Sequence, residues 1–287
     1  MGYQADVMVF SKHPFGFEED YVFNVQEQKH FKTLNILYKL FKHKDYDIFH
    51  FHGDTILPFQ LDEKFMNLMT KKYVFHYHGG ELRNGFKIIE ANSHKCLVST
   101  LDLLNYTNKG VWLPNPVDST IFYKANYFNK NNITVGTYVP VEPYVRKFAL
   151  IDETIEAVLH LKSQGYPVEY KLLHNLPYNM VPEFLSTIDI WVDKFGANTY
   201  GTLAIEAALS ECAVIAQYDQ RYKEWGCPFI NLPAKNLLKE CLLELIENER
   251  FRLKIAERGR DYALRIHDPL LCAKNSIKFY EEQISNS

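Results

Sequence analysis

Short strands and helices alternate along this chain, and a proline-rich break divides the alternation into two halves. The break is Leu113-Pro114-Asn115-Pro116-Val117-Asp118, in which two prolines restrict the backbone and remove two hydrogen-bond donors. Strands that alternate with helices predict parallel sheets with helices on both faces. A chain of 287 residues, 47% of them hydrophobic, is long enough to bury two such cores. We therefore expect an α/β protein with two doubly wound domains.

Runs of β-branched and aromatic residues predict the strands, and apolar residues at helical spacing predict the helices. In the first half, strands are expected over residues 5–10, 47–52, 73–77, 95–99 and 111–113, and helices over 28–43, 57–70 and 101–106. In the second half, strands are expected over 133–137, 168–173, 188–192 and 213–217, and helices over 152–164, 181–186, 202–209, 237–248, 249–266 and 269–284. Asp152 is the expected helix cap, and Gly165 is expected just after that helix ends.

These elements predict a first domain over residues 1–118 and a second domain over residues 119–267. We expect the last helix, within residues 268–287, to pack back on the first domain. The polar, asparagine-rich segment over residues 122–132 suits a connection at the surface.

Composition excludes several classes of protein. The net charge is −3 and the isoelectric point about 6.4, so no overall basic surface for nucleic acid is expected. Five scattered cysteines without a Cys-x-x-Cys pair predict neither a zinc ribbon nor a disulfide framework, and they suit a reducing cytoplasm. The N-terminus has no basic region followed by an apolar stretch, and no apolar run is long enough to span a bilayer. We therefore expect a cytoplasmic protein.

The stretch from Asp193 to Ala208 contains the strongest candidates for a binding site. A strand ends here, a loop with Gly201 follows, and a helix with Glu206 in its second turn is expected to begin. The N–H groups and partial positive charge at a helix N-terminus suit a diphosphate, and a carboxylate accepts hydrogen bonds from ribose or sugar hydroxyls. Alternatively, Glu206 is a capping or ion-paired acid of an ordinary strand–loop–helix unit, and the residues alone favour neither interpretation.

Arg146 and Lys147 form an adjacent basic pair before the helix expected over residues 152–164. Cations at the carboxyl edge of a parallel sheet face the crevice in which such folds bind ligands. A guanidinium also suits bidentate contact with a diphosphate. Taken by itself, such a pair is more often simply exposed to solvent.

Together these segments resemble the retaining GT-B glycosyltransferases of the large family four, or group 1, type. The matching motifs of the first half are Asp47-Ile-Phe-His-Phe-His52, His78-Gly79-Gly80-Glu81, Leu97-Val-Ser-Thr100 and Pro114-Asn115-Pro116-Val117-Asp118. Those of the second half are Val135-Gly136, Arg146-Lys147 and Gly201 with Glu206-Ala207. Each match is weak alone, but their order along most of the chain is specific.

The resemblance implies a GT-B fold, in which two Rossmann-like domains face a cleft, and a role in polysaccharide biosynthesis. The implied activity is transfer of a hexose, with retention, from a UDP- or GDP-linked sugar to a glycan or lipid-linked acceptor. Glu206 would hold the ribose hydroxyls, and Arg146 and Lys147 would stabilise the leaving diphosphate in place of a metal, so no cofactor is expected.

The resemblance also implies particular site residues. His78 would lie across the cleft near the transferred sugar, and backbone N–H groups near Gly201 would hold the phosphates. The implied catalytic residues are His78, Arg146, Lys147 and Glu206. The implied donor-binding residues are Gly136, Arg146, Lys147, Asn198, Tyr200, Gly201, Thr202 and Glu206.

The sequence also departs from the family pattern. Asn198 stands where the family has the first acid of a Glu-x7-Glu motif, and Glu211 stands where a glycine is usual. The segment over residues 2–7 resembles the family's second strand, so we expect a truncated N-terminal domain without the usual first strand, glycine-rich loop and first helix. A protein partner that completes this domain would restore the acceptor side.

Three other patterns have competing interpretations. His50, His52, His76 and His78 form two His-x-His pairs that suit a four-histidine zinc site, although histidines at strand ends are more often structural. Asp45-Tyr46-Asp47 has the spacing of a metal-binding Asp-x-Asp motif, but we interpret it as a solvated start of a strand. The basic amphipathic segment over residues 28–44 suits peripheral contact with an anionic membrane, or ordinary packing on a sheet.

Two other functions remain open beside glycosyl transfer. A sugar-nucleotide epimerase has the same double-Rossmann layout, but it would transfer nothing to an acceptor. A catalytically silent binding subunit would fit the truncated first domain and Asn198, and it would copurify with an active partner.

Overall fold

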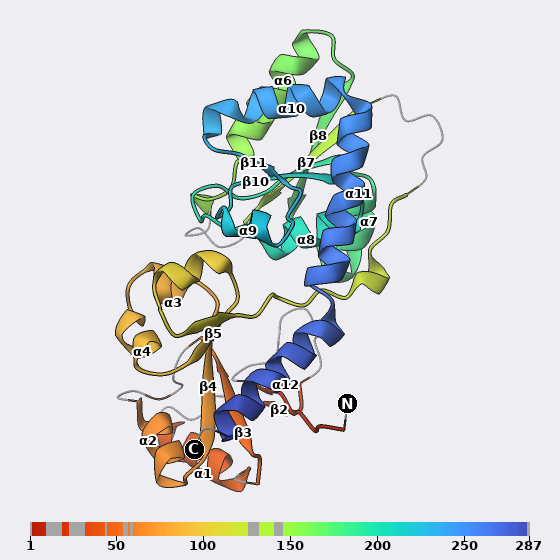
Figure 1. Cartoon of the computed structure of the whole chain (residues 1–287). Helices are drawn as coiled ribbons and strands as arrows, with labels where there is room; N and C mark the ends of the chain where they lie inside the picture. Colours follow the sequence, from red (N-terminus) through yellow and green to blue (C-terminus); the bar gives the residue numbers. More distant parts are fainter. Residues whose placement is uncertain are drawn as a thin grey trace. The chain divides into compact units, whose positions relative to one another are not determined.

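The computed structural model of this protein describes residues 2–9, 19–22, 32–43, 45–53, 57, 60–125, 132–140 and 146–285. The chain divides into two compact units (Figure 1). The first unit comprises Met1–Tyr77 and Tyr280–Ser287, and the second comprises His78–Phe279. The domain boundaries expected from the sequence, at residues 118 and 267, stay predictions.

The first unit is built around two parallel strand pairs. β1 (Met8–Val9) pairs with β2 (Tyr21–Val22), and β3 (Ile48–His52) pairs with β4 (Lys72–Tyr77) in a register that places His52 beside His76. Helices α1 (Lys32–Lys42) and α2 (Leu61–Leu68) accompany these strands. The buried side chains of this unit include Ile36, Leu40, Phe51, Met66, Val74, Phe75 and Tyr77. In addition, the hydroxyl of Tyr3 donates to Glu281 Oε1 (2.6 Å), near the end of the C-terminal helix.

The second unit begins with short helices and one further strand pair. They are α3 (Gly80–Arg83), α4 (Ile88–Ser93), β5 (Cys96–Val98), η3 (Leu101–Asn105), β6 (Gly110–Trp112) and η4 (Ser119–Ile121). β5 and β6 are parallel neighbours. The sequence predicts a helix over residues 101–106, and the structure has a 3₁₀ helix there; a segment this short is typical of a 3₁₀ connection.

A five-stranded parallel sheet forms the centre of the second unit, in the order β11-β10-β9-β7-β8. Its strands are β7 (Ile133–Val139), β8 (Val168–His174), β9 (Ile190–Val192), β10 (Ala213–Ala216) and β11 (Ile230–Asn231). The chain passes from β7 to β8 on one side and then returns to β9 on the other side of β7. This reversal of strand order makes β7 and β9 the topological switch point, beside which open α/β sheets bind ligands.

Helices cover both faces of this sheet. They are α6 (Ile151–Ser163), α7 (Val181–Ser186), α8 (Thr202–Leu209), α9 (Arg221–Glu224), α10 (Leu238–Glu247) and α11 (Glu249–Ile266), with the short helices η5 (Tyr178–Met180) and η6 (Lys235–Leu237). Ile190 and Val192 of β9 face the core made with α6 and α10, whereas Trp191 faces the core made with α8 and α11. A strand buried on both faces is expected to be continuously apolar, as β9 is.

The proline-rich break packs against the end of α11. The backbone carbonyl oxygen of His267 accepts a hydrogen bond from the N–H of Val117 (3.0 Å). In the side chain of His267, Nδ1 lies 2.8 Å from the carbonyl oxygen of Asn115. Nε2 of the same ring contacts the hydroxyl of Tyr200 at 3.1 Å. Burial lowers the pKa of His267 to about 4, so the ring is neutral at physiological pH.

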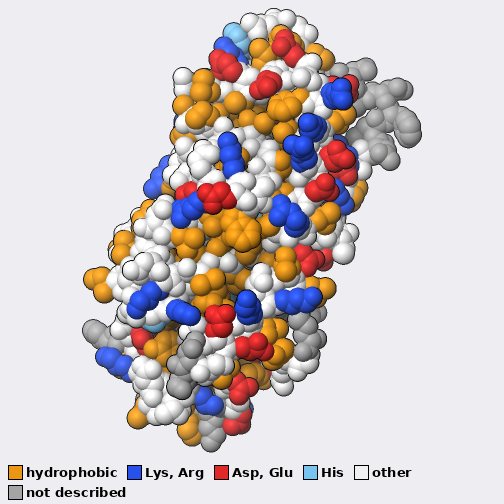
Figure 2. Space-filling model, in the orientation of Figure 1, with side chains coloured by type: hydrophobic (Ala, Val, Ile, Leu, Met, Phe, Trp, Pro, Cys, Tyr) orange, Lys and Arg blue, Asp and Glu red, His pale blue; other side chains and the backbone are white. Residues whose placement is uncertain are grey.

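α12 (Pro269–Ser285) is the last helix of the chain, and its residues from Tyr280 onward belong to the first unit. Among the helices of the described part of the chain, none has an apolar stretch that is long enough to cross a bilayer. Figure 2 shows Lys and Arg side chains interspersed with Asp and Glu over the face that it draws.

Most expected elements of the second unit are confirmed, and α7, α8 and α11 have the predicted bounds. Gly165, just after α6, has φ +91°, a left-handed conformation that favours glycine at the end of a helix, as predicted. The predicted cap was wrong: α6 begins after Leu150, and Asp152 lies in its first turn, where a carboxylate favours the helix dipole. The sequence did not indicate α3, α4 or α9, because each is too short to show a helical period.

Glu211 provides the first testable prediction. This residue, for which the family resemblance predicts a glycine, adopts φ 57°, a conformation that is strained for a side chain with Cβ. We expect Glu211→Gly to raise the free energy of unfolding by about 0.5–1 kcal/mol and Tm by about 2 °C. Glu211→Ala is the control, because it removes the 3.9 Å ion pair with Arg260 but retains the strain. Thermal unfolding that shows no gain of the glycine variant over the alanine variant would contradict the prediction.

Candidate functional site

The candidate site lies at the carboxyl edge of β7 and β9. Asp193 directly follows β9, a loop continues to Gly201, and α8 then begins at Thr202. The strand order brings this loop and the end of β7 to the same edge of the sheet. The predicted strand–loop–helix arrangement is therefore confirmed, with Glu206 in the second turn of α8.

Asp193 closes the loop before α8. Its carboxylate is 1% exposed, and Oδ2 accepts the N–H of Gly201 at 2.7 Å. Burial raises the pKa of Asp193, whereas the charge of Lys194 and the Gly201 hydrogen bond oppose that rise. A phosphate at the Gly201 N–H, as the family resemblance implies, would have to replace this carboxylate.

Lys194 places a cation beside the same loop. Its Nζ would lie 3.7 Å from a Cβ built on Gly201, which puts the ammonium group next to the start of α8. Burial lowers the pKa of Lys194, and the neighbouring charge of Asp193 opposes this effect. Sequence reasoning did not select Lys194, although its position immediately after a buried strand at the ligand edge was a usable signal.

Glu206 is a buried carboxylic acid with one described partner. Its side chain is 3% exposed, and Oε1 accepts a hydrogen bond from the hydroxyl of Tyr178 at 3.3 Å. Burial raises the pKa of Glu206 to about 7, and the Tyr178 hydrogen bond acts in the opposite direction. The acid therefore changes charge near neutral pH, which is common at functional sites. Tyr178, in η5, was missed because its contact with Glu206 joins residues distant in the sequence.

The other predicted donor-binding residues lie in different environments. Gly136 is buried in β7, where an added Cβ would meet Ile188 Cγ2 at 2.9 Å and Trp191 Cε3 at 3.0 Å, so close packing explains this glycine. Tyr200 is buried too, and its hydroxyl contacts that of Tyr262 at 2.7 Å. The contacts of Gly136 and Tyr200 with a donor stay predictions.

The remaining predicted residues are exposed to solvent. They are His78, Arg146, Lys147, Asn198 and Thr202. Asn198 adopts φ 52°, which asparagine tolerates better than most residues, and its carbonyl accepts the N–H of Asp219 at 3.0 Å. Lys147 Nζ lies 4.9 Å from the ring centre of Phe148. Their catalytic and binding roles stay predictions, and residues 141–145, before Arg146, are outside the described part of the chain.

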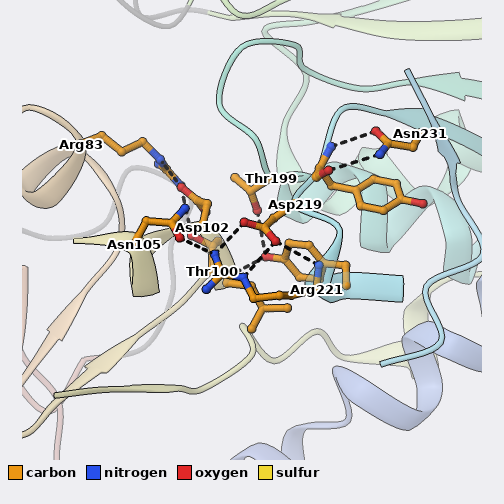
Figure 3. A network of polar contacts seen from close by, with 11 residues as sticks. Arg83, Thr100, Asp102, Asn105, Thr199, Asp219, Arg221 and Asn231 are labelled. Atoms are coloured by element: carbon orange, nitrogen blue, oxygen red, sulfur yellow. Dashed lines mark hydrogen bonds and ion pairs between the residues drawn. The ribbon is translucent and has the colours of Figure 1, made fainter. Parts of the chain in front are cut away.

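A polar network near this loop was not foreseen from the sequence (Figure 3). Arg83 donates twice to Asp102, at 2.7 and 3.0 Å, and once to Thr100 at 3.0 Å. Arg221 donates to both carboxylate oxygens of Asp219, at 2.9 and 2.6 Å, and to Asn105 Oδ1 at 2.9 Å. The Arg83 contacts join α3 to the η3 segment, and the Arg221–Asn105 contact joins η3 to α9.

A tyrosine continues the same network to the site loop. The hydroxyl of Tyr222 accepts the N–H of Leu101 at 3.0 Å and lies 2.9 Å from Thr199 Oγ1 (Figure 3). Because Thr199 stands between Asn198 and Tyr200, the position of the loop depends on α9 and η3 as well as on Asp193.

Comparisons with known proteins identify the fold. No family model matches the chain. An uncharacterized glycosyltransferase from Methanocaldococcus jannaschii, MJ1178, is 26% identical over 233 residues, which make up 75% of this chain and 64% of that protein. The chain thus spans less than two thirds of the length of this relative.

Similarity to solved structures identifies the fold of the chain. HepE from Anabaena, in complex with UDP and glucose, superposes with a TM-score of 0.66 at 12% identity, covering 96% of this chain and 91% of that one. A glycosyltransferase from Rickettsia africae superposes with a TM-score of 0.65 at 14% identity, covering 91% of this chain and 84% of that one. Sucrose-phosphate synthase from Thermosynechococcus elongatus superposes with a TM-score of 0.61 at 14% identity, covering 97% of this chain and 83% of that one. The fold is GT-B. The predicted α/β class and GT-B fold are confirmed, and so is the resemblance to glycosyltransferases, while the group 1 type, the truncated first domain and the retaining stereochemistry stay predictions.

The buried Glu206 of this GT-B chain makes stability depend on pH. Its pKa in the folded protein, about 7, exceeds the ordinary value of 4.5, so the folded state binds more protons between these values. The free energy of unfolding therefore contains a penalty that grows as pH rises from about 4.5 to 7 and is complete above pH 7. We expect Glu206→Gln, which cannot ionise, to be more stable than the wild type at pH 8 by up to about 3 kcal/mol.

Denaturant unfolding at pH 5 and pH 8 tests this expectation. At pH 5 the folded wild type carries a protonated Glu206, so the two proteins should differ little. Glu183→Gln, at an exposed position of α7, is the matched control and should show no such pH dependence. A stability difference between Glu206→Gln and the wild type that is equal at both pH values would contradict the prediction.

Proposed function

We propose that this protein is a glycosyltransferase that uses a nucleotide-diphosphate sugar, UDP- or GDP-linked, as its donor. The observation that carries the proposal is the buried carboxylate of Glu206, in the helix that begins at the topological switch point of the sheet. Two further facts support it: the relative from M. jannaschii is named a glycosyltransferase, and HepE has a similar fold and was solved with UDP and with UDP-glucose.

The proposed roles follow the chemistry of the groups at this edge. Ionised Glu206 accepts hydrogen bonds from the ribose hydroxyls of the donor. Arg146 and Lys147 stabilise the negative charge of the leaving diphosphate, and Lys194 adds a cation beside the start of α8. His78 contacts the transferred sugar.

Backbone groups complete the proposed donor site. Gly136, Tyr200, Gly201 and Thr202 bring the backbone close to the diphosphate, and Asn198 faces the sugar through an amide in place of the usual acid. The N–H of Gly201 becomes available only when the Asp193 carboxylate moves away from it, so donor binding and this hydrogen bond are alternatives.

In the proposed reaction, a hydroxyl oxygen of a glycan or lipid-linked acceptor forms a bond with the anomeric carbon of the hexose. The bond from that carbon to the diphosphate breaks, and the departing nucleoside diphosphate takes the acceptor proton. Retention of configuration and independence from metal ions are part of the proposal. The cations of the chain then supply the charge stabilisation that a metal supplies elsewhere.

The proposed location is the cytoplasm, with peripheral contact to a membrane through residues 28–44 and with a protein partner. In the described part of this segment, Ile36 and Leu40 are buried, whereas Tyr38 and Phe41 are 65% and 50% exposed. Exposed aromatic side chains on a basic helix suit contact with an anionic lipid surface.

Donor binding is tested first by thermal unfolding with UDP, GDP and their glucose and mannose conjugates in EDTA. One nucleotide, at about 100 times its dissociation constant, should add about 2.7 kcal/mol of stability to the wild type. Because the ribose hydroxyls donate to an ionised carboxylate, the shift should grow as pH rises from 6 to 8 and should be lost in Glu206→Gln.

Glu183→Gln, exposed in α7, is again the control and should bind as the wild type does. Equal shifts in Glu206→Gln and the wild type would refute the role of Glu206. If no nucleotide shifts the wild type, the donor site does not form in this chain alone, and a silent binding subunit becomes the better interpretation.

Turnover is tested by release of nucleoside diphosphate from the donor identified in this way, with and without glycan acceptors. We expect Arg146→Ala to lower kcat roughly 10²–10³-fold, the usual effect of removing one group that stabilises the charge of a transition state. Lys162→Ala, at an exposed position of α6, should retain full activity. An Arg146→Ala variant as active as the wild type would refute the assigned role, and isomerised donor without transfer would indicate an epimerase.

A further inference from the structure

Three histidines come together in the first unit. His50 and His52 are two positions apart on β3, so both side chains lie on one face of the strand. His76 of β4 is the direct register partner of His52. One face of a parallel strand pair therefore presents three imidazoles.

The imidazoles are close enough to share one ion. One ring nitrogen from each histidine lies within 4.8 Å of the corresponding nitrogens of the other two. Zinc–nitrogen bonds of about 2.0–2.1 Å in a tetrahedral site place two ligand nitrogens about 3.4 Å apart. Closing the cluster around an ion therefore requires shifts of about 1 Å. The rings of His50 and His52 are stacked with their centroids 4.3 Å apart, so they must also turn until their in-plane lone pairs converge.

His50 has an additional contact that orients its ring. Its Nδ1 lies 2.5 Å from the hydroxyl of Tyr280, in the part of α12 that belongs to the same unit. When Nδ1–H donates to this hydroxyl, Nε2 keeps its lone pair for a metal. A second partner that fixes the tautomer and orientation is a regular feature of histidines that bind metals.

The donor set selects the class of ion. The cluster consists of imidazoles, without a carboxylate among its described members, and this favours zinc and related transition metals over magnesium or calcium. His52 is exposed, His50 is half-buried and His76 is buried, so an ion has access from the side of His52. Three protein ligands leave a fourth position for water or another ligand, as in catalytic zinc sites.

We propose that His50, His52 and His76 form a three-histidine site for Zn²⁺ in the first unit, with Tyr280 orienting His50. The site differs from the four-histidine alternative raised by the sequence, because His78 is not part of the cluster and belongs to the second unit. It goes beyond the proposed glycosyl transfer, which uses no metal.

The test is titration of the 287-residue chain, stripped with EDTA and dialysed, with ZnCl₂ in a calorimeter. Metal content after removal of excess zinc is measured by plasma mass spectrometry. The wild type should bind one Zn²⁺ per chain. His52→Gln changes an exposed side chain, so the fold should persist, and its affinity for Zn²⁺ should fall at least tenfold. Tyr280→Phe keeps the ring and removes the hydroxyl, and it should weaken binding about 10–100-fold.

His174→Gln, which changes an exposed histidine at the end of β8, is the matched control and should bind zinc as the wild type does. Co²⁺ should give visible absorption bands of four-coordinate intensity in the wild type and in His174→Gln, but not in His52→Gln. Absence of stoichiometric zinc in the wild type would overturn the proposal and leave a structural cluster of rings. Equal affinity of the wild type and His52→Gln would overturn it as well.

Discussion

The reversal of strand order between β7 and β9 is the constraint on which the candidate site depends. Because all five strands are parallel, their carboxyl ends share one edge, and the reversal separates the connections that leave β7 and β9. The loop from Asp193 to Gly201 and the start of α8 lie at that edge for this reason. The apolar strands behind it, buried on both faces, hold the edge in place.

Two buried carboxylic acids lie at this edge, Asp193 and Glu206, and they differ in their hydrogen-bond partners. Burial raises the pKa of both. Asp193 accepts a backbone N–H at the start of α8, so it stabilises the loop. Glu206 accepts a hydrogen bond from the hydroxyl of Tyr178, and its pKa is about 7. Approaching hydroxyl donors would therefore favour its ionised form. The first acid therefore serves the structure, and the second is the better candidate for ligand binding.

The α/β class of fold was readable from the sequence because its signals are local and repeated, whereas the GT-B fold was what the family resemblance implied. Strand–helix alternation on both sides of a proline-rich break requires only the identities of nearby residues, and α7, α8 and α11 were predicted with their observed bounds. Glu206 was predicted for the same reason, from its spacing after Gly201. Tyr178 and the Arg83–Asp102 and Arg221–Asp219 pairs were missed, because each belongs to a contact network that joins distant segments.

The sequence by itself determined the class of fold and the segment that carries the candidate donor residues, since periodicity and turn chemistry act over a few residues. Only the tertiary structure decided that the Gly201 N–H is taken by Asp193, that Glu206 is buried against Tyr178, and that three of the four histidines form a cluster. Strand register and packing between distant segments set these contacts. They lie beyond what local residue patterns specify.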